Sequence, residues 1–159
     1  MFTSDGDAGL WYGHMVKSKS GVESFKDLIA WQKAFGLAIR IHRSTEGFPR
    51  EERYGIASEL RRTSRSIPYN IAEGHQRHTT REFVRFLDIA LGSQAELETQ
   101  ILFANRLGHF DPETGHALIG LCGEVGKIIR GLSASLLAGP NTDPRRASFR
   151  NSVPGRDSD

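Results

Sequence analysis

The chain has 159 residues, enough for one domain with a real hydrophobic core and not comfortably for two. Apolar residues make up 38% of it and charged residues 25%, as in a soluble globular protein. The net charge of +2 is too small to indicate nucleic-acid binding by itself, so the position of the charge along the chain matters more.

The sequence shows no pattern typical of a membrane-spanning segment or of a secretory signal. No run approaches the roughly 20 apolar residues that span a bilayer, so we expect no membrane partner. The first residues, MFTSDGDAGLWYGH, have neither the basic flank nor the apolar stretch of a secretory signal. A single cysteine, Cys122, excludes an intrachain disulfide framework and a cysteine-based zinc site. We therefore expect a cytoplasmic protein.

Both ends of the chain have a composition that favours flexible segments. Residues 1–23 are rich in Gly, Ser and Asp and show no periodicity, and residues 139–159 contain three prolines and few large apolar residues. We expect a flexible N-terminal extension over 1–23, one helical domain over 24–138 and a disordered tail over 139–159.

Two helices are predicted in the first half of the domain. Over residues 25–44, apolar side chains recur at three- and four-residue steps. The stripe consists of Leu28, Trp31, Phe35, Ala38 and His42, widened by Leu37 and Ile41. A second helix is expected from Pro49, a favourable first-turn residue, with Glu51 and Glu52 near the positive end of its dipole. Its apolar stripe is Ala57, Leu60, Ser64, Ile67 and Ile71.

Two further helices are predicted in the second half. Thr79 and Glu82 have the spacing of a capping box, which places the start of the third helix there. Its apolar residues are Phe83, Phe86, Leu87, Ala90, Leu91, Leu97, Ile101 and Leu102. The fourth helix is expected from Asp111–Pro112 to a stop at Gly139–Pro140. Its seam is Leu118, Leu121, Val125, Ile128 and Leu132. Short loops make successive helices antiparallel, so the fold class is an all-α, up-down-up-down four-helix bundle.

Pro68 lies inside the second predicted helix and would either break it or bend it. Proline removes the hydrogen bond to the carbonyl of Ser64 and crowds that carbonyl. The apolar spacing nevertheless continues through Ile67 and Ile71, and the first stop signal is Gly74, a natural residue after a helix end. We therefore expect a kinked, continuous helix, at a cost of about 3 kcal/mol that packing offsets. The alternative is two helices with a break at residue 67.

Basic side chains gather in the middle of the sequence. Residues 40–85 contain ten arginines against six acidic residues. A strip of Arg61, Arg62 and Arg65 precedes a loop with four more basic side chains, and Tyr69 lies beside the strip. The loop contributes His75, Arg77, His78 and Arg81. Arginine forks suit phosphates and an aromatic ring can stack on a base, so these residues are candidates for nucleic-acid binding. The alternative is a solvated helix face whose arginines pair with Glu59, Glu73 and Glu82.

The sequence contains no recognisable catalytic or metal-binding motif. It lacks HExxH, GxSxG and a glycine-rich phosphate loop after a strand. Only Glu113 and His116 have the spacing of a di-iron ligand pair, and they lie outside the seam of the fourth helix. Cys122 lies on an apolar helix and is expected to be a small core residue. We expect a protein that is not an enzyme, without cofactor or metal.

The third helix has more apolar residues than one core face accommodates. Phe83, Phe86, Ala90 and Leu97 cannot all face the same core as Leu87, Leu91 and Leu102 without a second packing partner, and the first helix is likewise apolar over more than one stripe. The expected partner is another copy of the chain, which makes the protein a homo-oligomer. The alternative is a single, unusually wide core face.

Three separated segments resemble the family of 23S ribosomal RNA intervening-sequence proteins. They are FKDLIAWQKAFGLAI, FPREERYGIASELRRTSRSIPYNIAEG and EFVRFLDIALGSQAELETQILFANRLG, and the resemblance covers about residues 24–137. It implies an antiparallel four-helix bundle that assembles into a ring-like homopentamer, with no enzymatic activity attached. Members of the family usually begin near Phe25, so the resemblance implies that residues 1–23 are an extension, either a variable arm or a segment that precedes a true start at Met15. A more distant resemblance is to the accessory variability proteins of diversity-generating retroelements, which bind nucleic acid and a reverse transcriptase.

The resemblance implies a role for only a few individual residues of this chain. The family's motif SIP-NIAEG is matched by a segment that contains Pro68, Asn70, Glu73 and Gly74, and its motif GS-ELET is matched between Gly92 and Thr99. Both are expected to be signatures of fold and assembly. Two functions remain open: a non-catalytic oligomer that binds RNA or DNA through its basic surface, and a scaffold for a protein partner such as a reverse transcriptase.

Overall fold

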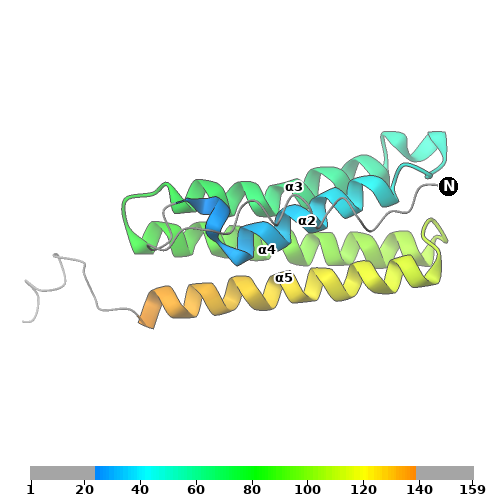
Figure 1. Cartoon of the computed structure of the whole chain (residues 1–159). Coiled ribbons are helices and arrows are strands. Elements are labelled where there is room, and N and C mark those ends of the chain that lie inside the picture. Colours follow the sequence, from blue (N-terminus) through cyan, green and yellow to red (C-terminus); the bar gives the residue numbers. More distant parts are fainter. Residues whose placement is uncertain (1–23, 139–159) are drawn as a thin grey trace, which may run out of the picture.

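The computed structural model describes residues 24–138, in which four long helices lie side by side (Figure 1). They are α2 (Ile29–Ser44), α3 (Ile56–His75), α4 (Thr80–Arg106) and α5 (Pro112–Ala138). Two short 3₁₀ helices, η1 (Phe25–Asp27) and η2 (Arg50–Arg53), precede α2 and α3. The tails predicted over 1–23 and 139–159 lie outside the described residues.

The four helices form a closed, antiparallel bundle. Each packs against the next in sequence, and α2 also packs against α5, so that α2 and α4 occupy diagonal positions. Figure 1 places the turn between α3 and α4 at one end of the bundle, and η2 with the turn between α4 and α5 at the other. The predicted fold class is confirmed.

The apolar stripe predicted for α3 is confirmed, but the start of the helix is wrong. All five stripe residues are buried. Pro49 precedes η2 instead of opening α3, and Gly55 is the N-cap of α3. The reason lies in Glu52, whose Oε2 accepts a hydrogen bond from the backbone N–H of Ile56 at 3.3 Å. The carboxylate thus satisfies a donor of the first turn of α3, and the preceding residues form a separate turn.

The buried face of α2 lies about one residue around the helix from the predicted face, although Leu37, Ala38 and Ile41 belong to both. The buried side chains are Ala30, Ala34, Leu37, Ala38 and Ile41. Phe35 is 44% exposed, and His42 is also exposed. Trp31 is half-buried and stacks on Phe35, with ring centroids 4.9 Å apart. Small alanines at the contact let α2 approach its neighbours closely, which leaves the aromatic rings at the edge of the core.

The helix α3 continues through Pro68, as predicted, and ends at His75. The helix thus ends near Gly74, as predicted, but Gly74 itself is helical and buried and the C-cap is Gln76, so its role as the residue after the helix end is wrong. A Cβ added to Gly74 would lie 2.6 Å from Cβ of Phe86 and 2.9 Å from Cδ2 of Phe83. This glycine therefore allows α3 and α4 to approach each other.

The helix α4 begins as predicted and has one core face. Thr79 is its N-cap, and its Oγ1 accepts a hydrogen bond from the backbone N–H of Glu82 at 3.2 Å. The buried residues are Phe83, Leu87, Ala90, Gln94, Leu97, Ile101 and Ala104. Phe83, Ala90 and Leu97 share the buried face of Leu87, whereas Phe86 and Leu91 are half-buried, so the apolar residues of α4 do not all face the core, as expected. Leu102 is the residue left outside, 52% exposed.

The helix α5 begins at Pro112, as predicted. Asp111 caps it, since its Oδ1 accepts a hydrogen bond from the backbone N–H of Thr114 at 2.9 Å. The buried seam is Gly115, Leu118, Cys122, Val125, Gly126 and Ile129. Leu121, Ile128 and Leu132, which were expected in the seam, are half-buried at its edge. The predicted stop at Gly139–Pro140 lies outside the described residues.

We predict opposite effects for two glycine-to-alanine substitutions. Gly74→Ala forces contacts with Phe83 and Phe86 and should destabilise the protein by about 1–3 kcal/mol. Gly92→Ala is the matched control, because Gly92 lies in α4 with nothing near its missing Cβ. It should stabilise the protein by about 0.5–1 kcal/mol through helix propensity alone. Urea unfolding followed by circular dichroism measures both, and a Gly74→Ala variant as stable as the parent would contradict the packing role.

Candidate nucleic-acid interface

The three arginines predicted to form a strip on α3 diverge in the structure. Arg61 is half-buried and its Nε donates a hydrogen bond to Oγ1 of Thr45, at the end of α2, at 2.8 Å. Arg62 reaches the other way and pairs with Glu96 of α4, with Nη2 and Oε1 3.1 Å apart. Arg65 lies exposed between them and makes no hydrogen bond or ion pair with any of residues 24–138.

Glu96 holds Arg62 within a small polar network between α3 and α4. Its Oε1 also accepts hydrogen bonds from Oγ1 of Thr63 at 3.1 Å and from Nε2 of Gln100 at 3.2 Å. The Arg62–Glu96 pair itself is mostly exposed, so it contributes at most about 1 kcal/mol to stability. Arg62 is thus positioned by α4 without being removed from solvent.

A shallow groove follows α3 around Arg65. It encloses about 470 Å³ and is lined by Arg62, Arg65, Ser66, Tyr69, Asn70 and Glu73, which we call the α3 groove. Tyr69 is 66% exposed. Ser66 forms a hydrogen bond with Ser93 of α4 at 2.9 Å, and Nδ2 of Asn70 donates to the backbone carbonyl of Ser66 at 2.8 Å. The groove therefore combines guanidinium groups, one aromatic ring and a polar floor.

The basic loop after α3 lies apart from the arginine strip. Arg77 is twelve positions beyond Arg65, which corresponds to about 18 Å along the helix axis. Arg77 pairs with Glu73, and its guanidinium carbon lies 4.8 Å from the ring centroid of Phe86. His78 and Arg81 are exposed. Only Arg77 and His78 lie in the loop, since His75 ends α3 and Arg81 lies in the first turn of α4, and of the four predicted residues His78 and Arg81 remain open to a ligand.

His75, the first of the four basic residues predicted in the loop, is a packing residue. Its ring lies edge-on to Phe83, with centroids 5.9 Å apart. Its Nδ1 is buried and has no hydrogen-bond partner among the described residues. The pairing expected under the solvated-face alternative is found only for Glu73, since Glu82 caps α4 and Glu59 forms no ion pair within residues 24–138.

The motif residues expected to be signatures of the fold have structural contacts. Pro68 and Gly74 are buried, and Asn70 bonds back to the preceding turn of α3. Glu73 lines the α3 groove and pairs with Arg77.

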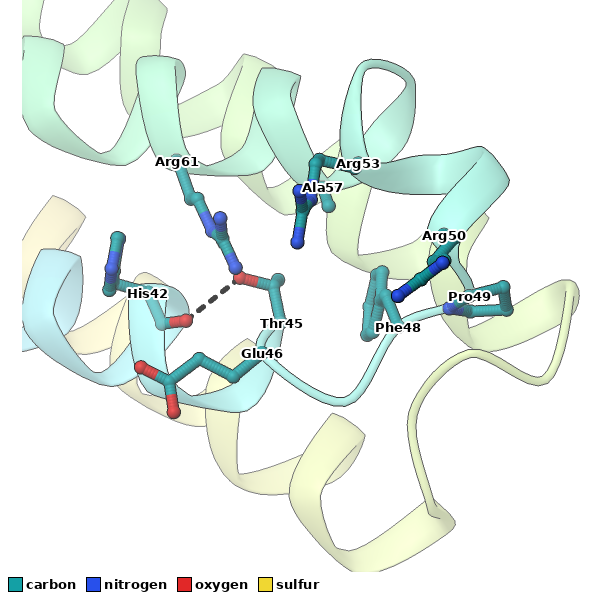
Figure 2. Close-up of a pocket in the computed structure, with 9 residues that line it drawn as sticks. All are labelled: His42, Thr45, Glu46, Phe48, Pro49, Arg50, Arg53, Ala57 and Arg61. Carbon is teal, nitrogen blue, oxygen red and sulfur yellow. Dashed lines mark hydrogen bonds between the residues drawn. The ribbon is translucent and has the colours of Figure 1, made fainter.

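A second basic concavity was not predicted from the sequence. It encloses about 430 Å³ at the η2 end of the bundle, and nine residues line it (Figure 2). They are His42, Thr45, Glu46, Phe48, Pro49, Arg50, Arg53, Ala57 and Arg61, which we call the η2 pocket. The segment FPREER, with Arg50 and Arg53 three positions apart, is the signal in the sequence, but the pocket also needs residues of α2 and α3 that only the fold brings beside it.

The residues considered for metal binding or catalysis do not converge. Glu113 and His116 are exposed in the first turns of α5. Residues 24–138 contain no group of three histidine, cysteine, aspartate or glutamate side chains close enough to hold a metal ion. Hydrogen bonds from the side chain and the backbone of Thr114 lower the pKa of Asp111, in keeping with a helix cap.

Cys122 is a buried core residue whose environment suppresses ionisation. Burial raises the pKa of its thiol to about 11, the charge of Glu98 acts in the same direction, and a hydrogen bond from Gln94 opposes both. Nε2 of Gln94 lies 3.5 Å from Sγ. The thiol is therefore a poor nucleophile in the folded protein.

We predict a stability loss at alkaline pH that depends on Cys122. The folded pKa is above the ordinary value of 9.0, so the unfolded chain ionises first and stability falls as the pH rises from there to about 11. Urea unfolding at pH 8 and at a pH near 10 measures the loss, which Cys122→Ala should reduce. Alkylation should be slow until urea unfolds the chain, and rapid alkylation of the native protein would contradict this.

One protein family matches the chain. The sequence model described as 23S rRNA-intervening sequence protein matches residues 26–131, well over half of the sequence. The chain belongs to this family. The resemblance drawn from the three sequence segments is confirmed, and the matched range contains α2, α3, α4 and most of α5. The family's description names no reaction, and it leaves the function of this intervening-sequence protein open.

A solved structure supports the same fold. The chain is similar to a protein of unknown function from the S23 ribosomal protein family of Bacteroides thetaiotaomicron, with 20% sequence identity and a TM-score of 0.60. The match covers 66% of this intervening-sequence protein and 98% of the other chain. At that identity the likeness shows the fold alone. No curated protein matches the chain. None of the helices within residues 24–138 is long and apolar enough to cross a membrane.

Proposed function

We propose that this intervening-sequence protein binds nucleic acid, RNA or DNA, without catalysing a reaction on it. The observation that carries the proposal is the α3 groove, in which the unpaired guanidinium of Arg65 lies beside the exposed ring of Tyr69. Arginine binds phosphate oxygens through two parallel hydrogen bonds, and a ring stacks on any base. Both contacts are tolerant of sequence, so little discrimination among sequences is expected.

The structure changes which arginines support this function. Arg65 and Arg62 line the α3 groove, and Arg81 offers a further positive charge just beyond the end of α3, near the exposed His78. Arg61 is bonded to Thr45 on the other side of the helix, and Arg77 is paired with Glu73. A single subunit therefore offers only a few phosphate contacts, which salt weakens readily.

Self-association would multiply these contacts. Large apolar side chains remain exposed on α2 and α4, including Ile29, Phe35 and Ile39 on the first and Ile89, Leu102 and Phe103 on the second. They support a homo-oligomer formed through these faces, with the pentamer that the family resemblance implies. Five copies of a weak site can engage a polyanion at several points, which raises the overall affinity without new contacts.

A specific observation also favours a second function, a scaffold for a protein partner. Leu102, Phe103 and Leu107 are each more than half exposed and lie together in the last turns of α4 and at its C-cap. Exposed apolar side chains grouped in this way are typical of protein–protein contacts. The partner would be another protein, such as a reverse transcriptase.

The nucleic-acid proposal predicts that charge reversal at Arg65 weakens binding. Arg65→Glu should reduce the affinity for a fluorescent single-stranded oligonucleotide by roughly tenfold or more per site and should lower the dependence on salt. Arg130→Glu is the matched control, because it makes the same charge change on α5, which does not border α3. Anisotropy titrations at two salt concentrations, with the oligomeric state measured in parallel, give the result. If the parent does not bind at low salt, the scaffold becomes the better candidate.

The proposal of self-assembly predicts a mass of about five times 17.7 kDa at micromolar concentration. Multi-angle light scattering measures this directly. Ile39→Glu, which places a charge on the exposed face of α2, should dissociate the oligomer and leave the helical content unchanged. Ser58→Glu adds the same charge at an exposed position of α3 as a control. A parent protein that is monomeric under these conditions would rule out the assembly.

A further inference from the structure

We propose that the η2 pocket binds a phosphate monoester, either a free nucleotide or the terminal phosphate of a nucleic-acid chain. This site is separate from the α3 groove and goes beyond the function proposed for it. The pocket lies between the end of α2, η2 and the beginning of α3, and it encloses about 430 Å³. That volume falls within the range of small-molecule sites in proteins.

Positive charge dominates the lining of the pocket. Arg50, Arg53 and Arg61 contribute three positive charges against the single carboxylate of Glu46, so 3 − 1 gives +2 with His42 neutral. Figure 2 shows the guanidinium groups of Arg53 and Arg61 extending into the space beside Thr45, and the carboxylate of Glu46 lying on the opposite side. A dianionic phosphate matches this balance of charge.

Glu51 and Glu52 lie between Arg50 and Arg53 in the sequence and would be expected to pair with them. In the fold, the carboxylate of Glu52 has other partners. Its Oε2 accepts the hydrogen bond from Ile56, and its Oε1 lies 3.7 Å from Nε2 of His109. Glu51 is exposed and does not line the pocket. Among residues 24–138, no ion pair includes Arg50, Arg53 or Arg61. The three arginines therefore line one concavity without a carboxylate partner within residues 24–138, and the exposed Arg50 and Arg53 are free to exchange water for an anion.

The short helix η2 explains why two of the arginines act on the same site. A 3₁₀ helix has three residues per turn, so side chains three apart project from the same side. Arg50 and Arg53 have that spacing and both line the pocket. Phe48 packs edge-on against Phe110, with centroids 4.9 Å apart, which anchors the segment to the bundle. In an α-helix starting at Pro49, the two side chains would diverge by about 60°.

The third arginine is oriented before any ligand arrives. Nε of Arg61 donates to Oγ1 of Thr45, which leaves both Nη groups available for a fork on phosphate oxygens. The Thr45 hydroxyl lies 2.9 Å from each of the backbone carbonyls of Ile41 and His42 and donates its proton to them. Those carbonyls belong to the negative end of α2, which disfavours an anion. The hydrogen bond from the hydroxyl partly neutralises these carbonyls. The positive charges of the three arginines exceed the negative charge that is left at the helix end.

The apolar part of the lining suits an ester more than a free inorganic ion. Three apolar residues also line the pocket: Figure 2 shows Phe48 and Pro49 on the side of Arg50, and Ala57 beside Arg53. An esterified phosphate can place its charged oxygens on the arginines and its organic group against these residues. We therefore expect adenosine 5′-monophosphate to bind more tightly than inorganic phosphate.

The test is a calorimetric titration of the full chain with adenosine 5′-monophosphate, adenosine and inorganic phosphate. Adenosine should bind least, because it lacks the phosphate. Arg53→Ala should weaken binding of the monophosphate by roughly tenfold or more, since Arg53 is exposed and bonds to nothing else described. Arg53→Lys should recover part of the loss, and Arg130→Ala should leave the affinity unchanged. Equal affinities of the parent and Arg53→Ala, or equal binding of adenosine and its monophosphate, would overturn the proposal.

Two further measurements are needed. One distinguishes a free nucleotide from the end of a nucleic-acid chain as the source of the phosphate, and the other distinguishes the η2 pocket from the α3 groove. If the pocket takes the end of a nucleic-acid chain, a 5′-phosphorylated oligonucleotide should bind more tightly than its 5′-hydroxyl counterpart, and Arg53→Ala should abolish that difference. If only the free monophosphate depends on Arg53, the source is a nucleotide. Arg65→Glu should leave monophosphate binding intact, so a failure of the α3 groove and a failure of the η2 pocket give different results.

Discussion

The close contact between α3 and α4 is the constraint on which the rest of the bundle depends. Gly74 leaves room for Phe83 and Phe86 at one end, and Ser66 meets Ser93 at hydrogen-bond distance near the middle. A glycine opposite the two phenylalanines and a pair of serines near the middle therefore let the two helices pack closely. The larger polar residues of α3 are then left at the surface, and this is why Arg65 and Tyr69 border a groove instead of packing into the core.

The same contact gives the family motif a structural explanation. Pro68 and Gly74 are buried, Asn70 bonds back to Ser66, and Ser66 bonds across to α4. Each residue supports the geometry of the helix or its approach to a neighbour, and none is arranged for chemistry. A motif of this kind identifies the fold, and membership in the intervening-sequence family therefore says little about the ligand. The ligand is better inferred from side chains outside the motif.

How much could be predicted from the sequence differed from helix to helix for physical reasons. The stripe of α3 and the Thr79 cap depend on local spacing, and both were predicted. The face of α2 was misassigned because its contact is made by alanines, whose small size matters only when a neighbouring helix is present. The η2 pocket could not be predicted, since it joins residues from α2, η2 and α3. The predicted arginine strip is divided by the fold: Arg62 and Arg65 line the α3 groove with Tyr69, whereas Arg61 lines the η2 pocket.

Whether an arginine of this protein is free to bind a ligand depends on the neighbouring carboxylates. A carboxylate that is held elsewhere by another hydrogen bond leaves the arginine unpaired. Glu73, in the last turns of α3, pairs with Arg77, four positions later in the loop, which leaves His78 and Arg81 as the exposed, unpaired basic side chains there. Glu52 is adjacent in sequence to Arg53, but its carboxylate is held at the start of α3, and the arginines of η2 remain unpaired. Net charge does not distinguish these cases, because each segment contains acids and bases in similar number. A chain with a net charge of only +2 can therefore present strongly positive sites wherever its fold gives the acids another partner.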